Sequence, residues 1–239
     1  MKTKFKDIYI NYEVLGEKGP WIVFLHGWGG STESFKIVAE SFDTNRCLLF
    51  DFPPFGESEE PYEVWNNDTY VALLKHILDE LKIKTCDIIA HSFGGRVAIK
   101  FANRYNESVK KIILVDSAGV KPRFSLKKFV RIKRYKLAKK FGLKTRDYSS
   151  SDYKKLSPLM KKTFVNIISE DLSPLLKNIT CPTLIIFGKD DKETPLYMAK
   201  KINKKIKDSA LVVFENCGHF AYLEDFYRFV AISKSFLKG

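Results

Sequence analysis

Short apolar runs alternate with helical patterns along most of this 239-residue chain, and that alternation restricts the fold more than any other feature. Several runs are continuously apolar and rich in β-branched residues, which is typical of strands buried on both faces. Between them, apolar residues recur at helical spacing. The predicted strands span residues 8–15, 21–26, 47–52, 86–91, 111–117, 183–188 and 210–214, and the predicted helices span residues 32–42, 67–81, 93–105, 196–206 and 223–237.

This order predicts an α/β fold whose mostly parallel sheet has helices on both faces. The first two predicted strands have no helix between them, so we expect them to form an antiparallel hairpin at one edge. Residues 119–180 contain helical patterns but no strand-like run. We expect them to form a helical cap inserted into a core made of residues 1–118 and 181–239.

Composition favours a single soluble domain. The 45% of hydrophobic and 29% of charged residues exclude disordered, collagenous and coiled-coil classes. No apolar run approaches the ~18 residues of a membrane span, and the N-terminus does not resemble a signal peptide, so a cytoplasmic location is expected. The four cysteines lie far apart without a CxxC pair, which argues against a zinc site or a disulfide framework.

The most informative motif is CDIIAHSFGG, in which Ser92 stands between a predicted strand and a predicted helix. A nucleophilic serine at such a sharp turn needs small residues two positions away on either side, and Ala90 and Gly94 supply them. The usual motif is G-x-S-x-G, so Ala90 is a mild departure from it. A serine that merely caps a buried helix would give the same pentapeptide, and the motif alone does not separate the two interpretations.

The second motif is a glycine-rich loop, HGWGGST, which follows another strand. It does not fit the dinucleotide-binding pattern G-x-G-x-x-G, because Thr32 occupies the last glycine position, and no GK[ST] follows for a phosphate-binding loop. The alternative is a loop that turns the backbone N–H of Trp28 toward Ser92, as half of an oxyanion hole. His26 is then expected to fix the loop by hydrogen bonds.

Two later strands end in the motifs GKDDKETP and ENCGHF, which supply an acid and a histidine. A serine is inert at neutral pH unless a histidine accepts its proton, and that histidine needs a carboxylate to orient it. Ser92, Asp191 and His219 follow one another in this order, each just after a strand. Because the carboxyl ends of parallel strands share one edge of a sheet, the three residues are expected to converge there.

Together, HGWGG, DFPPFGES, AHSFGG, GKDDKETP and the final GH resemble the motifs of the α/β-hydrolase superfamily, in the same order and across the whole chain. The pattern is closest to small esterases and carbon–carbon bond hydrolases. HGWGG also resembles the corresponding loop of the pimeloyl-ester carboxylesterases of biotin synthesis. The resemblance implies a nucleophile at Ser92, an acid at Asp191, a base at His219, and backbone oxyanion donors at Trp28 and Phe93.

For the acid, the family pattern G-x-x-D-x-x-x-P selects Asp191 over Asp190, and Asp116 is a weaker candidate at the end of its own strand. His76 is expected on the surface, and the side chain of His91 is expected to point away from the site. Cys217 has no turn of its own that would make it a nucleophile.

The predicted function is a serine hydrolase that cleaves carboxylic esters through an acyl-enzyme, with no cofactor and no metal. Two alternatives remain. One is a carbon–carbon bond hydrolase with the same triad. The other is a non-catalytic protein that uses a hydrolase fold to bind a ligand, although such a role needs no triad.

The net charge of +13 arises from one segment. Residues 121–146 contain twelve basic residues and no acidic one, whereas the rest of the chain carries 29 basic and 28 acidic residues, a net charge of +1. The segment is interpreted either as the solvated face of the cap or as a surface for an acidic acyl carrier or an anionic membrane. The resemblance to pimeloyl-ester hydrolases favours the carrier. Nucleic acid is not expected, because no binding motif accompanies the charge.

Overall fold

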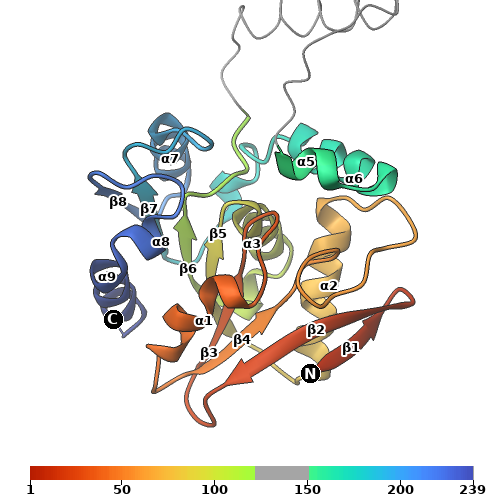
Figure 1. Cartoon of the computed structure of the whole chain (residues 1–239). Helices are drawn as coiled ribbons and strands as arrows, with labels where there is room; N and C mark the ends of the chain where they lie inside the picture. Colours follow the sequence, from red (N-terminus) through yellow and green to blue (C-terminus); the bar gives the residue numbers. More distant parts are fainter. Residues whose placement is uncertain (122–150, 239) are drawn as a thin grey trace, which may run out of the picture.

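One mixed sheet organises the computed structural model, which describes residues 1–121 and 151–238 (Figure 1). Within that part of the chain the strand order is β1-β2-β4-β3-β5-β6-β7-β8, and every neighbouring pair from β4 to β8 is parallel. The mostly parallel α/β sheet is therefore confirmed. The strands are β1 (Lys2–Phe5), β2 (Ile8–Leu15), β3 (Trp21–Leu25), β4 (Arg46–Phe50), β5 (Cys86–His91), β6 (Val109–Val115), β7 (Thr183–Gly188) and β8 (Ser209–Phe214).

The antiparallel hairpin at the edge is formed by β1 and β2, and not by β2 and β3 as the sequence suggested. β2 also pairs antiparallel with β4, which lies between β2 and β3. The apolar run of β3 is buried on both faces and has β4 and β5 as its neighbours, so it cannot lie at the edge. β1 was missed because its lysines alternate with less polar residues over only four positions.

Helices cover both faces of the sheet. They are α1 (Glu33–Glu40), α2 (Asn67–Glu80), α3 (Phe93–Arg104), α5 (Ser151–Lys155), α6 (Pro158–Ser169), α7 (Leu196–Lys205), α8 (Ala221–Glu224) and α9 (Phe226–Lys238), with short 3-10 turns at Asn106–Ser108 and Leu176–Asn178. Along β3, alternate side chains point to opposite faces: Ile22 and Phe24 pack with α1, α8 and α9, whereas Val23 and Leu25 pack with α2, α3 and α7.

Between β6 and β7, the described part of the expected cap contains α5, α6 and the second 3-10 turn (Figure 1). Ser157 caps α6 by accepting a hydrogen bond from the backbone N–H of Met160. The helix is tied to the start of α2, where the Asn67 side chain donates to the carbonyl of Ile167. Residues 119–180 remain the proposed extent of the cap. The basic segment lies outside the described residues except for Lys121.

Among the described residues, none of the helices combines the length and the apolar character needed to cross a membrane.

Candidate active site

Ser92 stands at the sharp turn between β5 and α3, with φ at 48° and ψ at −109°. Left-handed backbone of this kind is uncommon for residues other than glycine, and it marks a strained position. The turn is tight because α3 begins directly against β3. A Cβ atom at Gly94 would lie 2.1 Å from the backbone oxygen of Leu25, so only glycine fits there. Ala90 is accommodated in the strand and is fully buried.

A continuous chain of hydrogen bonds joins the three residues that the sequence singled out. The Nε2 atom of His219 lies 3.0 Å from the Ser92 hydroxyl, and its Nδ1 atom lies 2.8 Å from Oδ2 of Asp191. Ser92 follows β5, Asp191 follows β7, and His219 follows β8. The structure thus brings together three side chains from three loops at the carboxyl edge of the sheet.

Asp191 is held in place by its own loop. Its Oδ1 accepts the backbone N–H groups of Glu193 and Thr194, and the Thr194 hydroxyl lies 2.5 Å from Oδ2. Burial alone would raise the pKa of Asp191, but the hydrogen bonds from His219 and Thr194 outweigh it and hold the pKa below its usual value. Asp191 is therefore an anion at neutral pH, which is what the orienting acid requires.

The pairing of Asp191 with His219 also shifts the pKa of the histidine. Burial lowers its pKa, whereas the hydrogen bond and the negative charge of Asp191 raise it, and the net shift is upward. Glu193 raises the pKa of His219 further, since its exposed carboxylate lies 3.6 Å from Nε2.

The histidine loop packs closely against the end of β7 because Gly188 has no side chain. A Cβ atom at Gly188 would lie 2.0 Å from the backbone oxygen of Gly218.

Asp116, the weaker candidate for the acid, is fully buried, and the carboxylate that pairs with His219 Nδ1 is that of Asp191. The Asp116 carboxylate accepts the backbone N–H groups of Gly188 and Ala221, which belong to the acid loop and the histidine loop. Burial raises its pKa to about 7 despite these two hydrogen bonds. The geometry makes Asp116 a link between two loops and leaves Asp191 as the carboxylate in contact with His219.

The proposed oxyanion donors lie beside Ser92. Both residues line the same pocket as Ser92, and among the described residues no hydrogen bond has the backbone N–H of Trp28 or Phe93 as its donor. Their side chains pack edge to face, with ring centroids 5.4 Å apart. His26 fixes the glycine-rich loop as expected: its Nδ1 donates to the carbonyl of Gly27, and its Nε2 accepts the backbone N–H of Phe52. Burial lowers the pKa of His26 to about 4, so it stays neutral.

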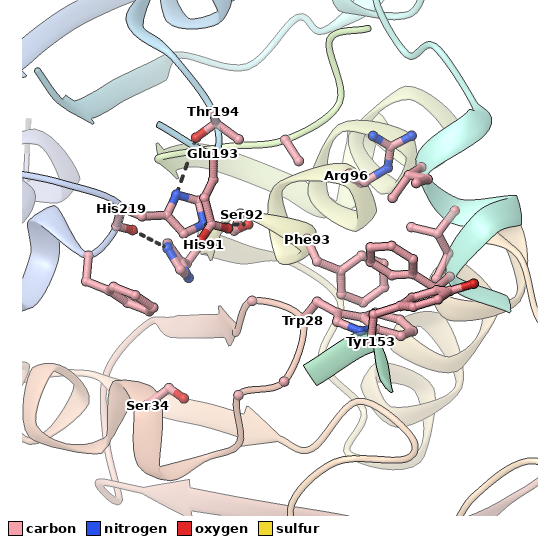
Figure 2. Close-up of a pocket in the computed structure, with 18 of the residues that line it drawn as sticks. Trp28, Ser34, His91, Ser92, Phe93, Arg96, Tyr153, Glu193, Thr194 and His219 are labelled. Atoms are coloured by element: carbon pink, nitrogen blue, oxygen red, sulfur yellow. Dashed lines mark hydrogen bonds and ion pairs between the residues drawn. The ribbon is translucent and has the colours of Figure 1, made fainter. Parts of the chain in front are cut away.

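His91 does not point away from the site, contrary to the expectation from sequence. Its Nε2 lies 2.7 Å from the backbone carbonyl of His219, and because a carbonyl only accepts, Nε2 carries the proton (Figure 2). Burial, together with the charge of His219, lowers its pKa to about 3. His91 thus supports the histidine loop as a neutral donor. No residue spacing in the sequence indicated this contact.

The two remaining candidates from the sequence, His76 and Cys217, take no part in the hydrogen bonds that join Asp191, His219 and Ser92. His76 is partly exposed on α2, 3.2 Å from the Thr3 hydroxyl, and Cys217 is a buried thiol. Within residues 1–121 and 151–238, no three His, Cys, Asp or Glu side chains converge in a way that would hold a metal ion.

A pocket of about 640 Å³ opens onto Ser92 and His219 (Figure 2). One wall is aromatic: the ring centroid of Trp28 lies 5.2 Å from that of Phe164 on α6. The rest of the lining mixes apolar with polar side chains, and Arg96 and Glu193 add charge to it. The pocket can therefore hold a small organic molecule with its reacting atom beside Ser92.

Comparison with known proteins agrees with this architecture. A family model described as the alpha/beta hydrolase fold matches residues 20–157 and 147–226. The chain is 28% identical to the AB hydrolase superfamily protein YisY of Bacillus subtilis, over 94% of this chain and 93% of that protein. It is 24% identical to the 2-hydroxy-6-oxo-2,4-heptadienoate hydrolase of Pseudomonas putida, over 96% of this chain and 93% of that protein.

Among solved structures, the esterase EaEST from Exiguobacterium antarcticum superposes with a TM-score of 0.79 at 24% identity, covering 97% of this chain and 96% of that one. At this identity the likeness concerns the fold.

Proposed function

The chain belongs to the alpha/beta hydrolase fold family, and from that premise we propose that it is a serine hydrolase that cleaves carboxylic esters of small molecules. The observation that carries the proposal is the unbroken chain of hydrogen bonds from Asp191 through His219 to Ser92, at the wall of a pocket. That arrangement provides a nucleophile, a base and an orienting acid within contact of one another.

In the proposed first step, Oγ of Ser92 attacks the ester carbonyl carbon while Nε2 of His219 accepts the hydroxyl proton. The imidazolium that forms is stabilised by Asp191. The carbonyl oxygen becomes an oxyanion and accepts hydrogen bonds from the backbone N–H groups of Trp28 and Phe93. The tetrahedral intermediate then collapses, the carbon–oxygen bond breaks, and His219 returns its proton to the departing alcohol.

In the second step, His219 removes a proton from water, which attacks the acyl-enzyme carbonyl. The same two N–H groups bind the second oxyanion. Breakdown of this intermediate releases the carboxylic acid and restores the Ser92 hydroxyl, so every proton taken up by His219 is returned. None of these steps draws on a cofactor.

A panel of p-nitrophenyl esters with acyl chains of increasing length tests the proposal, with Ser92→Ala as the matched control. We expect turnover by the wild-type protein and its loss in the variant. Absence of turnover for every ester would contradict the proposal and would favour a protein that only binds its ligand.

A second candidate is hydrolysis of a carbon–carbon bond beside a ketone. It is favoured by the similarity to a relative named as a 2-hydroxy-6-oxo-2,4-heptadienoate hydrolase. The same Ser92, Asp191 and His219 would serve that reaction. Parallel measurement of kcat/KM for simple esters and for a vinylogous diketone separates the two candidates, because the true substrate class should be turned over with far higher efficiency.

A further inference from the structure

Arg96 places a buried positive charge in the candidate active-site pocket. It stands in the first turn of α3, four positions after Ser92. Only 5% of Arg96 is exposed, and it lines the same pocket as Ser92, Ala118 and Ile167. In the view of Figure 2, it lies on the opposite side of Ser92 from His219.

Among the described residues, the guanidinium group of Arg96 has fewer hydrogen-bond acceptors than it has N–H donors. Its Nη2 donates to the backbone carbonyl of Glu170, while its buried Nε has no hydrogen-bond partner within residues 1–121 and 151–238. The two carboxylates whose charges act on it are engaged elsewhere. The Glu170 carboxylate accepts from Lys100 and Asn67, and the Asp171 carboxylate accepts from its own loop. Among the described residues, no carboxylate hydrogen-bonds to Arg96.

A buried charge without a paired counter-charge is unfavourable, so its presence in a ligand pocket needs a reason. Burial lowers the pKa of Arg96 to about 10, although Glu170 and Asp171 oppose the shift. The side chain is therefore still a cation at neutral pH. Guanidinium groups bind carboxylates through two parallel N–H donors, which makes a carboxylate the natural missing partner.

We propose that Arg96 binds a carboxylate on the acyl part of the substrate, so that the enzyme prefers half-esters of dicarboxylic acids to neutral esters of equal length. The inference rests on the ester hydrolysis proposed above. In that reaction the leaving alcohol lies beside Nε2 of His219, which protonates it. Since Arg96 lies on the other side of Ser92, it faces the acyl group and not the alcohol.

The test compares kcat/KM for monoethyl glutarate with that for ethyl pentanoate, and monoethyl adipate with ethyl hexanoate. In the wild type, we expect the charged ester of each pair to be favoured. In Arg96→Gln, the ratio of charged to neutral ester should fall by roughly 30-fold or more, because a buried charge pair loses one partner. Arg96→Lys keeps the charge but not the paired N–H donors, and its ratio should fall less.

Arg104 provides the matched control. It lies two turns further along α3, and its guanidinium group is paired with Asp68 outside the pocket. Arg104→Gln therefore removes the same side chain from the same helix and should leave the ratio at its wild-type value. A wild-type ratio of one or less, or a ratio unchanged in both Arg96 variants, overturns the inference. If Arg96→Gln does not fold, as judged by its thermal unfolding, Arg96→Lys decides the question.

Calorimetry of monoethyl glutarate and ethyl pentanoate binding to the inactive Ser92→Ala variant separates this inference from the proposed function. If the wild type hydrolyses neutral esters but shows no preference for charged ones, only the role of Arg96 is wrong. If it hydrolyses no ester, the proposed function is wrong. Tighter binding of monoethyl glutarate than of ethyl pentanoate, lost when Arg96→Gln is added, still supports the carboxylate site in that case, and equal binding rejects it.

Discussion

The Nε2 atom of His219 lies 3.0 Å from the hydroxyl of Ser92, although 127 residues separate the two along the chain. Parallel strands make this meeting possible, because the loops after β5 and β8 emerge at the same edge of the sheet. Ser92 stands at the strained turn after β5, and hydrogen bonds from His91 to the His219 carbonyl and from the Ala221 N–H to Asp116 hold the histidine loop in place.

Loss of either partner in this pair should abolish turnover. We expect Ser92→Ala and His219→Ala each to reduce kcat by about 10⁶, since residues that act as one unit are lost together. The double variant should be no worse than either single one. A fluorophosphonate probe, followed by mass spectrometry, should label the wild type once, at Ser92. Labelling that persists in Ser92→Ala would show that another residue is the nucleophile.

The two buried carboxylates give opposite predictions. Asp191→Asn should lower kcat by about 10⁴, because the imidazole loses the acceptor that holds its tautomer. Asp116→Asn should lose far less activity, since the Asp116 carboxylate accepts hydrogen bonds from two backbone N–H groups of the neighbouring loops and does not orient the His219 ring as Asp191 does. It should instead lower the free energy of unfolding by about 1–3 kcal/mol, as one buried N–H loses its acceptor. Near-full activity in Asp191→Asn with an inactive Asp116→Asn would reverse the assignment.

Glycine at position 94 should be required for stability as well as for activity. A methyl group there would collide with the backbone oxygen of Leu25, which cannot rotate away as a side chain could. Gly94→Ala should therefore lower the free energy of unfolding, measured with urea, by about 1–3 kcal/mol. Gly218→Ala is the control, because the nearest atom to its Cβ would be 3.4 Å away. Equal stability of the two variants would contradict this account of the turn.

Much of the site follows from chain order and local motif. Ser92, Asp191 and His219 each come just after a strand, and a parallel sheet leaves only one edge on which all three can meet. The order of the strands in the sheet was harder to predict. Nothing in the apolar runs of β2 and β3 shows that β4 inserts between them, because pairing depends on contacts distant in sequence.

The hydrogen bonds between loops could not be predicted from the sequence either. The hydrogen bond from His91 to the His219 carbonyl joins two segments whose separation in space no motif fixes. Thr194 likewise supports Asp191 through a turn that the sequence does not specify. Arg96 could have been noticed, since it stands in the first turn of the helix that begins directly after Ser92. Its lack of a carboxylate partner is visible only once α6 is in place.

The final prediction concerns pH. His219 must be neutral to accept the Ser92 proton, and its pKa is raised above the usual 6.5, since Asp191 and Glu193 together outweigh the effect of burial. The neutral form is therefore lost as pH falls through this raised value. The kcat/KM for a simple ester should fall toward acid with a single protonation and a midpoint above 6.5. A rate that is flat between about pH 5 and 8 would exclude His219 as the base.

Glu193→Gln sharpens the test, because it removes a negative charge 3.6 Å from Nε2 while leaving the hydrogen bond to Asp191 intact. The acid midpoint should move to lower pH, and the difference from the wild type should shrink in high salt, since the Glu193 side chain is 74% exposed. Glu215→Gln is the control: that carboxylate is also exposed but pairs with Lys189. An acid midpoint that moves upward in Glu193→Gln, or moves as far in Glu215→Gln, would mean that Glu193 does not act on the His219 imidazolium.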